Sequence, residues 1–324
     1  MARIFITGGA GFIGSCVAQR LLDMGHEIAL YDSFVSYVYP LDKVYAYNIA
    51  KRVEMLKGQA QIIRGSTVDQ GYLRHALLDF KPQRIIHLAA MPLANLAIDR
   101  PEEAARSILT GTLNLLEVTR DLTGLERLVY ISSSMVYGDF IKVPAPEDHP
   151  TDPKEMYGSM KLSGELLTRA FGRLYGLDYS IVRPSAVYGM TDNNRRVIGI
   201  FLENALDGKP LLVRGADQSL DFTYVTDTAA GVVAAAMHPN ASSQVFNITR
   251  GRGRSILEVA QIIAKLIPDT QIQVAEADKK LPTRGELDVS RAVELIGYQP
   301  KVDIEEGISM YLDFIKQRRA EIGA

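Results

Sequence analysis

The chain begins with an apolar strand pattern, a glycine-rich turn and a helix pattern in direct succession. Residues 4–6 are apolar, glycines follow at positions 8, 9, 11 and 14, and apolar residues then recur at helical spacing from Ile13 to Leu22. A dinucleotide-binding fingerprint requires this order, because the N-terminus of the helix offers free N–H groups to a pyrophosphate. The start of the chain is therefore predicted to bind a dinucleotide.

The glycines of this turn have distinct expected roles. Gly8 and Gly9 would allow a tight turn of the backbone. Gly11 would let the backbone approach a pyrophosphate, and Gly14 would let the helix pack closely on the strand. The alternative interpretation is a glycine turn that binds no ligand.

An acidic residue stands where a dinucleotide site needs one. The second strand pattern, residues 27–32, ends in Asp32, which lies 18 residues after Gly14. A carboxylate at this point bonds the ribose 2′-OH and repels a 2′-phosphate. Ser33 and Phe34 follow it, with no arginine beside them to hold a phosphate. The pattern therefore predicts NAD rather than NADP.

Composition excludes several other classes of protein. With 324 residues, 47% of them hydrophobic, the chain can form a large α/β core and a smaller lobe. The net charge of −2 gives no electrostatic reason to expect nucleic acid or an anionic membrane as a partner. No apolar run approaches the roughly 20 residues that span a bilayer. A single cysteine, Cys16, and a start inside the first strand suggest a cytoplasmic protein without a signal peptide.

Strand and helix patterns alternate through the first part of the chain. This alternation, with strands apolar throughout, predicts a Rossmann-type, doubly wound parallel sheet covered on both faces. Residues 33–60 are weakly patterned and are expected to form a loop and a short helix. The further strands are expected at 61–64, 84–90, 127–131 and 179–182, and the helices at about 72–77, 99–122 and 154–175. The helix over about 99–122 is expected to begin near Pro101, because proline is tolerated in a first helical turn.

The rhythm changes after Arg183-Pro184. We expect a NAD-binding domain over residues 1–183 and a smaller, mixed α/β substrate lobe over 184–324, with about 222–248 returning to the first domain. In this part the helices are expected at 197–207, 227–237, 255–266 and 305–319, and short strands near 211–213, 222–225, 245–248 and 271–274.

Three residues form a candidate catalytic set. Tyr157 and Lys161 are four residues apart at the start of a predicted helix and so share a face. A lysine ammonium lowers the pKa of a nearby phenol, and such a tyrosine can act as a general base. Ser133 ends a strand that points to the same crevice, where its hydroxyl could bond the reacting oxygen. The alternatives are a surface Tyr and Lys and serines that merely end a strand.

Seven motifs occur in order and together cover nearly the whole chain. With them the chain resembles the extended short-chain dehydrogenase/reductase family, in its nucleotide-sugar epimerase/dehydratase branch. The resemblance implies a tightly held NAD, a Ser–Tyr–Lys catalytic set with Ser133 as its serine, and a C-terminal lobe that binds a nucleoside-diphosphate sugar. The motifs are segments 7–14, 87–90, 132–138, 157–161, 183–189, 221–225 and 297–300.

Site residues follow from the motifs and the resemblance, and no metal is expected. The predicted catalytic residues are Ser133, Tyr157 and Lys161. The predicted cofactor-binding residues are Gly8, Gly11, Phe12, Ile13, Gly14, Asp32, Ser66, Thr67, Leu88, Ala89, Ala90, Tyr157, Lys161 and Pro184. The predicted substrate-binding residues are Ser133, Ser134, Met135, Tyr157, Ala186, Arg195, Arg196 and Arg284.

Departures from the family pattern bear on the reaction. The family's 4,6-dehydratases carry an Asp-Glu pair directly after the catalytic residue, where this chain has Ser134 and Met135. A thioether transfers no proton, so dehydration is not expected. Related sugar-acid decarboxylases tend to carry Glu in place of Met135, which counts against decarboxylation less strongly. Epimerisation, most often at C4, needs neither carboxyl group and is the predicted reaction.

Other departures concern the substrate. Ala186 and Ile108 each stand where the family usually has Asn, and Leu220 stands where it usually has a diphosphate-binding Arg. A guanidinium elsewhere could bind the diphosphate, or a sugar carboxylate, in a bidentate manner, although each candidate could equally be a surface arginine. The candidates are Arg195, Arg196 and Arg284.

Two other functions stay open at this point. One is a net oxidoreductase that acts on a keto sugar or a small hydroxy acid, which the apolar Leu220 and Ala186 favour somewhat. The other is a NAD-binding regulator without catalysis, against which the intact Ser-Tyr-Lys set argues. The resemblance also implies a homodimer through a four-helix bundle of the 99–122 and 154–175 helices, unless their leucines only pack on the sheet. These leucines are Leu109, Leu113, Leu116, Leu162 and Leu166.

Overall fold

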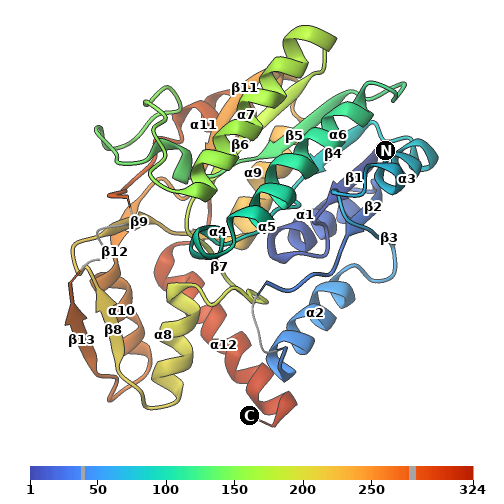
Figure 1. The fold of residues 1–324 in the computed structure, drawn as a ribbon. Coiled ribbons are helices and arrows are strands. Elements are labelled where there is room, and N and C mark those ends of the chain that lie inside the picture. Colours follow the sequence, from blue (N-terminus) through green and yellow to red (C-terminus); the bar gives the residue numbers. More distant parts are fainter. Residues whose placement is uncertain (38–40, 277–281, 324) are drawn as a thin grey trace.

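A seven-stranded parallel sheet forms the centre of the molecule (Figure 1). The computed structural model describes residues 1–37, 41–276 and 282–323. The strand order is β11-β6-β5-β4-β1-β2-β3, and each neighbouring pair is parallel. This confirms the predicted Rossmann-type fold. The strands are β1 (Arg3–Thr7), β2 (Glu27–Asp32), β3 (Gln61–Arg64), β4 (Arg84–His87), β5 (Arg127–Ile131), β6 (Tyr179–Pro184) and β11 (Gln244–Ile248).

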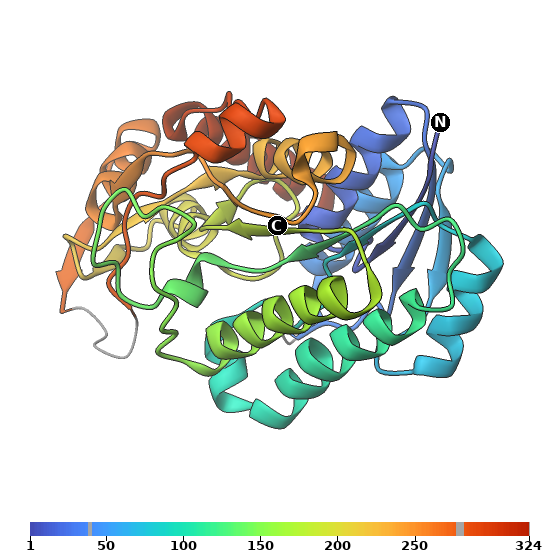
Figure 2. The same ribbon diagram turned by 90° about the horizontal axis from the view of Figure 1, so that it is seen from above.

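Helices cover both faces of this sheet (Figure 2), because alternate strand residues are apolar on either side. Ile4 and Ile6 of β1 pack into one core, whereas Phe5 between them packs into another. The helices of the first face are α1 (Phe12–Asp23), α9 (Val225–Met237) and α11 (Ser290–Ile296). Those of the second face are α3 (Gln70–Phe80), α6 (Gly111–Thr119) and α7 (Met156–Tyr175).

A smaller lobe adjoins the carboxyl ends of the strands. It has its own apolar core, which includes Leu211, Val259 and Ile308. Its strands pair two by two: β7 (Val187–Tyr188) with β10 (Thr223–Tyr224), β8 (Leu211–Arg214) with β13 (Ile272–Ala275), and β9 (Ser219–Asp221) with β12 (Gly253–Ser255). Its helices are α8 (Val197–Leu206), α10 (Ile256–Leu266) and α12 (Ile304–Ile322).

Segments from both sides of residue 183 share the large sheet. Strand β11 pairs with β6, and α9 packs on α1. The division into domains at about residue 183, with about 222–248 returning to the first domain, stays a prediction. None of the helices in the described ranges combines the length and the apolarity that crossing a membrane requires.

One predicted long helix contains a π-helical turn. The expectation of a helix over about 99–122 that begins near Pro101 is confirmed apart from its last residues, since the helical residues run from Pro101 to Thr119. Arg100, the residue before Pro101, has a φ of −134° and ends the preceding helix, as a residue before proline tends to. Pro101 then begins a new helix, and a π-helical turn (Arg106–Thr110) leads into α6. The pieces before α6 are α4 (Ala94–Asp99) and α5 (Pro101–Ala105).

Other boundaries also differ from the predictions. The strand expected near 222–225 is two short strands, β9 and β10, and helix α9 begins at Val225. The weakly patterned segment 33–60 contains α2 (Lys43–Met55), which is longer than the expected short helix; residues 38–40 of this segment lie outside the described part. The side chain of Asp42 caps α2 by accepting a hydrogen bond from the amide of Tyr45. Helix α11, β7 and β12 were not predicted.

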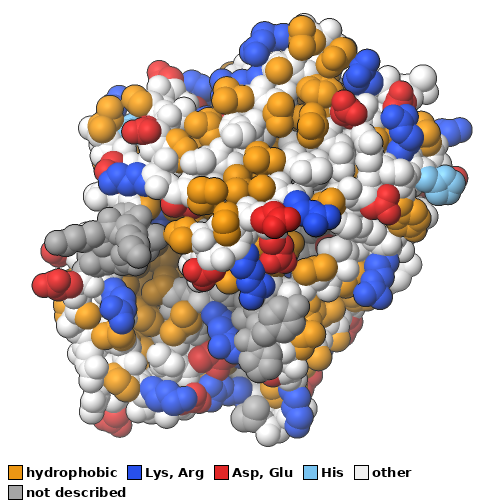
Figure 3. All heavy atoms as spheres, in the orientation of Figure 1, with side chains coloured by type: hydrophobic (Ala, Val, Ile, Leu, Met, Phe, Trp, Pro, Cys, Tyr) orange, Lys and Arg blue, Asp and Glu red, His pale blue; other side chains and the backbone are white. Residues whose placement is uncertain are grey.

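The leucines on α6 and α7 divide into two groups. Leu116 is fully buried against the sheet, and Leu162 packs on Val136 and Tyr137, so neither faces outward as predicted. Leu113 and Leu166 are exposed, and together with Leu109 they line a shallow groove between the two helices. Figure 3 shows hydrophobic side chains gathered over this part of the surface.

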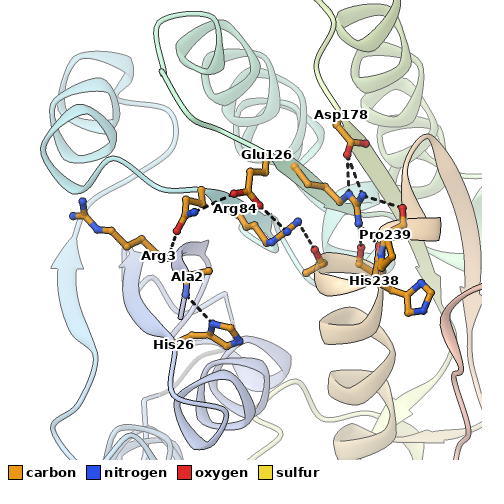
Figure 4. A network of polar contacts seen from close by, with 12 residues as sticks. Ala2, Arg3, His26, Arg84, Glu126, Asp178, His238 and Pro239 are labelled. Carbon is orange, nitrogen blue, oxygen red and sulfur yellow. Dashed lines mark hydrogen bonds and ion pairs between the residues drawn. The ribbon is translucent and has the colours of Figure 1, made fainter.

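Ion pairs close the amino ends of the strands (Figure 4). Arg127 is buried at the start of β5, where its guanidinium donates to the Asp178 carboxylate at 3.0 and 3.1 Å and to the carbonyl of His238 at 2.6 Å. Arg84 at the start of β4 pairs with Glu126 at 2.7 Å. This edge is filled by the protein's own side chains, which leaves the opposite, carboxyl edge for a ligand.

Candidate functional site

A cleft of about 620 Å³ opens at the carboxyl ends of β1, β2 and β4. Its walls are the turn between β1 and α1, the end of β2 and the segment that follows β4. The smaller lobe contributes Asn193, Asn194 and Arg196 to the same cleft. The cleft therefore lies where open α/β sheets bind their ligands.

The glycine turn can be built only with glycines at its closest contacts. Gly8 has a φ of +69°, and a Cβ there would lie 2.7 Å from the amide nitrogen of Ala89. A Cβ on Gly14 would collide with the carbonyl of Gly8 and lie 2.8 Å from the Cα of Gly9, so α1 packs directly on the turn. Gly11 precedes α1, and no described side chain caps this helix. Its first amides therefore form a cradle for an anion such as a pyrophosphate.

Asp32 is fixed at the edge of the cleft. Its carboxylate accepts hydrogen bonds from the amides of Ala10 at 3.0 Å and Phe34 at 2.8 Å. Burial raises the pKa of Asp32, while these two amides and Arg52 oppose the rise. Each carboxylate oxygen keeps a further lone pair, which suits the ribose hydroxyls of NAD. The residues present therefore fit a dinucleotide without a 2′-phosphate.

Most predicted cofactor-binding residues lie together in this cleft. Tyr157, Lys161 and Pro184 are not among the described residues that line it. The predicted residues that do line it are Gly8, Gly11, Phe12, Ile13, Gly14, Asp32, Ser66, Thr67, Leu88, Ala89 and Ala90.

The side chain of Ser133 lies close enough to Tyr157 to act on the pKa of its phenol. Ser133 follows β5, and its hydroxyl accepts a bond from the amide of Met135 at 3.2 Å. Tyr157 is half-buried in the first turn of α7, which Glu155 caps by accepting from the amides of Tyr157 and Gly158, each at 2.7 Å. Glu155 was missed by the sequence analysis because helices usually begin with Ser, Thr, Asp or Asn.

Lys161 is buried, and its effect on the pKa of Tyr157 differs from the one expected. Its Nζ donates to the carbonyl of Ile131 at 2.8 Å and lies 5.8 Å from the ring centroid of Tyr157. Burial lowers the pKa of Lys161 to about 7, against the influence of Glu165. A buried lysine with this pKa is largely neutral above pH 7, so it offers little charge to the phenol.

The pKa of Tyr157 is accordingly raised rather than lowered. Burial raises it to about 12, while the charge of Arg196 and the hydrogen bond from Ser133 oppose this rise. The expectation that Lys161 lowers this pKa is therefore wrong for the polypeptide itself. The positive charge that acts against this rise comes from Arg196 of the smaller lobe.

The predicted substrate residues are dispersed around the cleft. Ser134 and Met135 are buried in a short 3₁₀ helix (Ser134–Tyr137), and the Ser134 hydroxyl has no hydrogen-bond partner among the described residues. Ala186 has a strained φ of +37°. Of this set, Arg196 lines the cleft, with its guanidinium 3.1 Å from the Asp192 carboxylate.

The other two candidate arginines differ in their surroundings. Arg195 is exposed, with a φ of +47°. Arg284 is half-buried, and its Nε has no hydrogen-bond partner in the described part of the chain. Burial lowers the pKa of Arg284 to about 10, while the carboxylate of Glu155 raises it. A shielded, underused guanidinium suits an anionic ligand better than an exposed one.

Arg52 of α2 is a cleft residue that the sequence did not reveal. It is only 5% exposed and lines the cleft beside Ala10. Its partners lie 42 and 139 residues away along the chain, and it stands in a segment without a clear pattern. No local signal could have identified it.

Comparisons with known proteins agree with this geometry. A sequence model of the NAD dependent epimerase/dehydratase family matches residues 4–249. The UDP-glucose 4-epimerase of Mycolicibacterium smegmatis is 31% identical, over 98% of this chain and 99% of the relative. UDP-glucuronic acid decarboxylase 1 of Danio rerio is 30% identical, over 97% of this chain and 73% of the relative.

A solved structure has the same fold. The crystal structure of UDP-glucuronic acid 4-epimerase from Bacillus cereus, in complex with UDP-glucuronic acid and NAD, superposes with a TM-score of 0.89. The two chains are 28% identical, and the match covers 97% of this chain and 99% of the other. This similarity extends over both the sheet and the smaller lobe.

Proposed function

The chain belongs to the NAD-dependent epimerase/dehydratase family, its cofactor is NAD, and we propose that it is a nucleotide-sugar 4-epimerase. The observation that carries this proposal is the placement of Ser133 beside Tyr157, whose phenol is also under the influence of the Arg196 charge in the wall of the dinucleotide cleft. Such a pair can remove a proton from a sugar hydroxyl and return it.

The proposed chemistry assigns one role to each side chain. A bound NAD would supply the hydride acceptor and donor for the sugar carbon. Tyr157 takes the proton of the sugar 4-OH on its phenolic oxygen, and Ser133 hydrogen-bonds the same sugar oxygen. Lys161 holds the nicotinamide ribose. The 4-keto sugar then turns, so that its other face receives the hydride while Tyr157 returns the proton.

The raised pKa of Tyr157 makes nearby positive charge necessary for this role. Arg196 supplies such a charge from the smaller lobe, and a nicotinamide cation would act in the same direction. Turnover would therefore depend on both lobes, since the base belongs to one and the stabilising guanidinium to the other.

Elimination and decarboxylation fit the site less well. Both Ser134 and Met135 follow Ser133 without a carboxyl group, and the amide of Met135 already bonds the Ser133 hydroxyl. Because decarboxylases are among the relatives, loss of CO₂ is a specific outcome to be tested. A net oxidoreductase is the second alternative, as Leu220 and Ala186 offer no polar group to a diphosphate.

Two arginines are the proposed ligands of the diphosphate. Arg284 has an unpartnered, shielded Nε within the described residues, and Arg196 lines the cleft. Arg195 is exposed and is the weakest of the three candidates. Ser134 and Ala186 are proposed to contact the sugar. Which sugar and which nucleotide are bound is a question for a substrate panel.

We also propose a homodimer in the cytoplasm. A second copy would cover the groove lined by Leu109, Leu113 and Leu166, since large exposed leucines on neighbouring helices favour a partner. Light scattering at micromolar concentration is expected to give twice the chain mass of 35.7 kDa. A monomeric mass would refute this part of the proposal.

Isotope labelling tests the reaction. The purified protein is incubated with UDP-, GDP-, CDP- and dTDP-sugars, and an active substrate is then used with deuterium at C4. An epimerase returns the label to C4 of the product and accumulates no NADH. Stoichiometric NADH would identify a dehydrogenase, released CO₂ a decarboxylase, and solvent deuterium at C5 or C6 a dehydratase.

A further inference from the structure

The loop over residues 191–196 of the smaller lobe lies between α8 and α2 (Figure 1), and its Asn193, Asn194 and Arg196 line the cofactor cleft. We propose that Arg52 is a positioning residue that holds this loop in place, and that slow release of NAD depends on it. This inference rests on NAD being the cofactor, and it deepens the proposed epimerase function.

Arg52 joins three separate segments through one buried guanidinium. Its Nη2 donates to the carbonyl of Thr191 and its Nε to the Thr191 hydroxyl at 3.4 Å. Its Nη1 points to the carbonyl of Ala10, in the glycine turn, at 3.4 Å. The rigid fork of the guanidinium thus ties the loop to the phosphate cradle, which a lysine could not do with a single nitrogen.

The loop requires such a support because its backbone is strained. Thr191 has a φ of +67°, a conformation that is unfavourable for a β-branched residue. Arg195, at the other end of the loop, has a φ of +47°. Strained residues persist only where surrounding contacts hold them, and both bonds from Arg52 to the loop end on Thr191.

Further contacts join the loop to the helices α2 and α1. The amide of Asn48, one turn before Arg52 in α2, donates to the side-chain oxygen of Asn193 at 2.7 Å. Within the loop, Asp192 pairs with Arg196, whose guanidinium lies 5.8 Å from the ring centroid of Phe12. The loop is therefore attached to α2 on one side and lies over the start of α1 on the other.

Helix α2 is itself anchored. Tyr47 packs on Phe314 of α12, with 6.1 Å between ring centroids, and Lys51 pairs with Glu321 at 3.8 Å. Arg52 consequently holds the loop against a fixed support. Movement of the loop requires loss of the Arg52 contacts rather than a shift of α2.

The position of the loop gives these contacts a function. Arg52, Asn193, Asn194 and Arg196 line the same cleft as the glycine turn. A dinucleotide in the cleft is enclosed by the loop and leaves only when the loop opens. An epimerase needs this enclosure, because the NAD that accepts the hydride must stay bound to return it. Arg52 also sets the place of Arg196, which opposes the raised pKa of Tyr157.

Release of NAD from the holoenzyme tests the proposal without any sugar substrate. The protein is loaded with isotope-labelled NAD, excess unlabelled NAD is added, and the bound label is counted after rapid gel filtration. Arg52→Met is expected to accelerate release by roughly tenfold or more, as loss of two charge-assisted hydrogen bonds implies. Arg52→Lys, which keeps the charge but not the fork, is expected to release nearly as fast.

A second substitution separates positioning from direct binding of the cofactor. Thr191→Gly removes the cost of the positive φ at this position, so the loop no longer needs Arg52 to hold that conformation. The double variant Arg52→Met/Thr191→Gly is therefore expected to release NAD at least about threefold more slowly than Arg52→Met. If Arg52 acted only as a phosphate ligand, glycine at 191 would give no such rescue, and the proposal would be overturned.

Two control variants show whether faster release of NAD results only from a loss of protein stability. Arg127→Met removes an equally buried arginine that bonds backbone carbonyls at the opposite edge of the sheet, and it is expected to leave NAD release unchanged. If Arg52→Met fails to fold, Asn48→Ala removes the parallel link and is expected to release NAD about two- to fivefold faster. Release within twofold of the unmodified protein in every variant at 52 and 48 that folds would refute the proposal. Absence of epimerase activity, by contrast, would refute only the proposed function.

Discussion

The two halves of the site are constructed in different ways. The cofactor half consists mainly of backbone from one continuous stretch, in which glycines at 8, 11 and 14 and the start of α1 form a cradle, and Asp32 completes it. The proposed substrate half consists of side chains from distant segments, among them Ser133, Tyr157 and Arg284. A ligand recognised through backbone leaves a compact motif in the sequence, whereas a ligand recognised through dispersed side chains does not. Variants in one half should therefore leave the other half's ligand bound.

The largest expected effect lies in the substrate half. Tyr157→Phe keeps the ring that packs beside Met91 and Met160 but removes the proton-transferring oxygen. We expect turnover to fall by roughly 10³- to 10⁴-fold, the upper part of the range for general acid–base groups, with NAD binding and folding intact. Initial rates and the NAD content of the purified variant measure these two properties.

The same helix offers a matched control for this variant. Tyr175→Phe removes a hydroxyl from the exposed end of α7 and is expected to leave turnover unchanged. Ser133→Ala is expected to lose less than Tyr157→Phe, because Ser133 orients and polarises without accepting the proton. Loss of bound NAD in Tyr157→Phe would contradict the separation of the two halves.

A change in the glycine turn should instead weaken the binding of NAD. A Cβ on Gly11 would lie 2.9 Å from the carbonyl of Gly8, so Gly11→Val displaces the turn and blocks backbone approach to the pyrophosphate. We expect NAD affinity to fall at least about 10²-fold, because a cradle of backbone amides has no side-chain substitute. Isothermal calorimetry measures it.

Gly71→Val is the control for Gly11→Val. Gly71 lies in α3, where a Cβ would have only the Asp69 carboxylate nearby, at 3.7 Å, among the described atoms. This variant is expected to bind NAD with unchanged affinity. Tight NAD binding by Gly11→Val would show that the turn tolerates a side chain, and the cofactor half would then not be defined by its backbone.

A smaller effect is expected from a change at Asp32, which we expect to determine the preference for NAD over NADP. Asp32→Ala removes the carboxylate that would repel a 2′-phosphate, and it also releases the amides of Ala10 and Phe34. We expect the ratio of NAD to NADP affinity to fall by roughly 10- to 10²-fold, about 1.4 to 2.8 kcal/mol. Asp69→Ala, which removes an exposed carboxylate capping α3, should leave this ratio unchanged. An unaltered ratio in Asp32→Ala would assign the discrimination to another residue.

The features that the sequence predicts correctly follow the same division between local backbone and distant side chains. The sheet was predicted because its strands are uniformly apolar, and the glycine turn because its steric demands are local. The helix that begins near Pro101 was predicted because its apolar periodicity and its first-turn proline are local signals, whereas the π-helical turn inside it was not predicted.

The missed residues depend on the tertiary structure. Glu155 caps α7, although glutamate is uncommon at a helix start. Arg52 acts on Thr191, 139 residues further along the chain. The pKa values of Tyr157 and Lys161 depend on burial, and the sequence spacing of the two residues contains no information about burial.

The smallest expected effect concerns the support of the substrate half. Asp221, the last residue of β9, is fully buried, and its Oδ2 accepts from the Thr249 hydroxyl at 2.9 Å and from the amides of Gly251 and Leu287 at 3.1 and 3.2 Å. Its Oδ1 has no partner among the described residues. Burial raises the pKa of Asp221 from 3.8 to about 7. Between these two pH values the folded protein binds a proton that the unfolded chain has lost, so this group's stabilising contribution is present below pH 3.8 and is lost as the pH rises through 7.

Asp221→Asn removes this titration while keeping an oxygen for the same donors. The difference in unfolding free energy between the unmodified protein and this variant should therefore fall as the pH rises from 5 to 7, by at most about 1.4 kcal/mol per pH unit. Urea unfolding of both proteins at pH 5, 6, 7 and 8 measures the difference, in which the titration of all other groups cancels. A difference that stays constant over this range would mean that Asp221 is ionised in the folded protein. The smaller lobe would then contain a buried carboxylate that three donors keep charged. Carboxylates fixed by backbone amides would thus support both parts of the molecule, since Asp32 accepts from two amides beside the cofactor cleft.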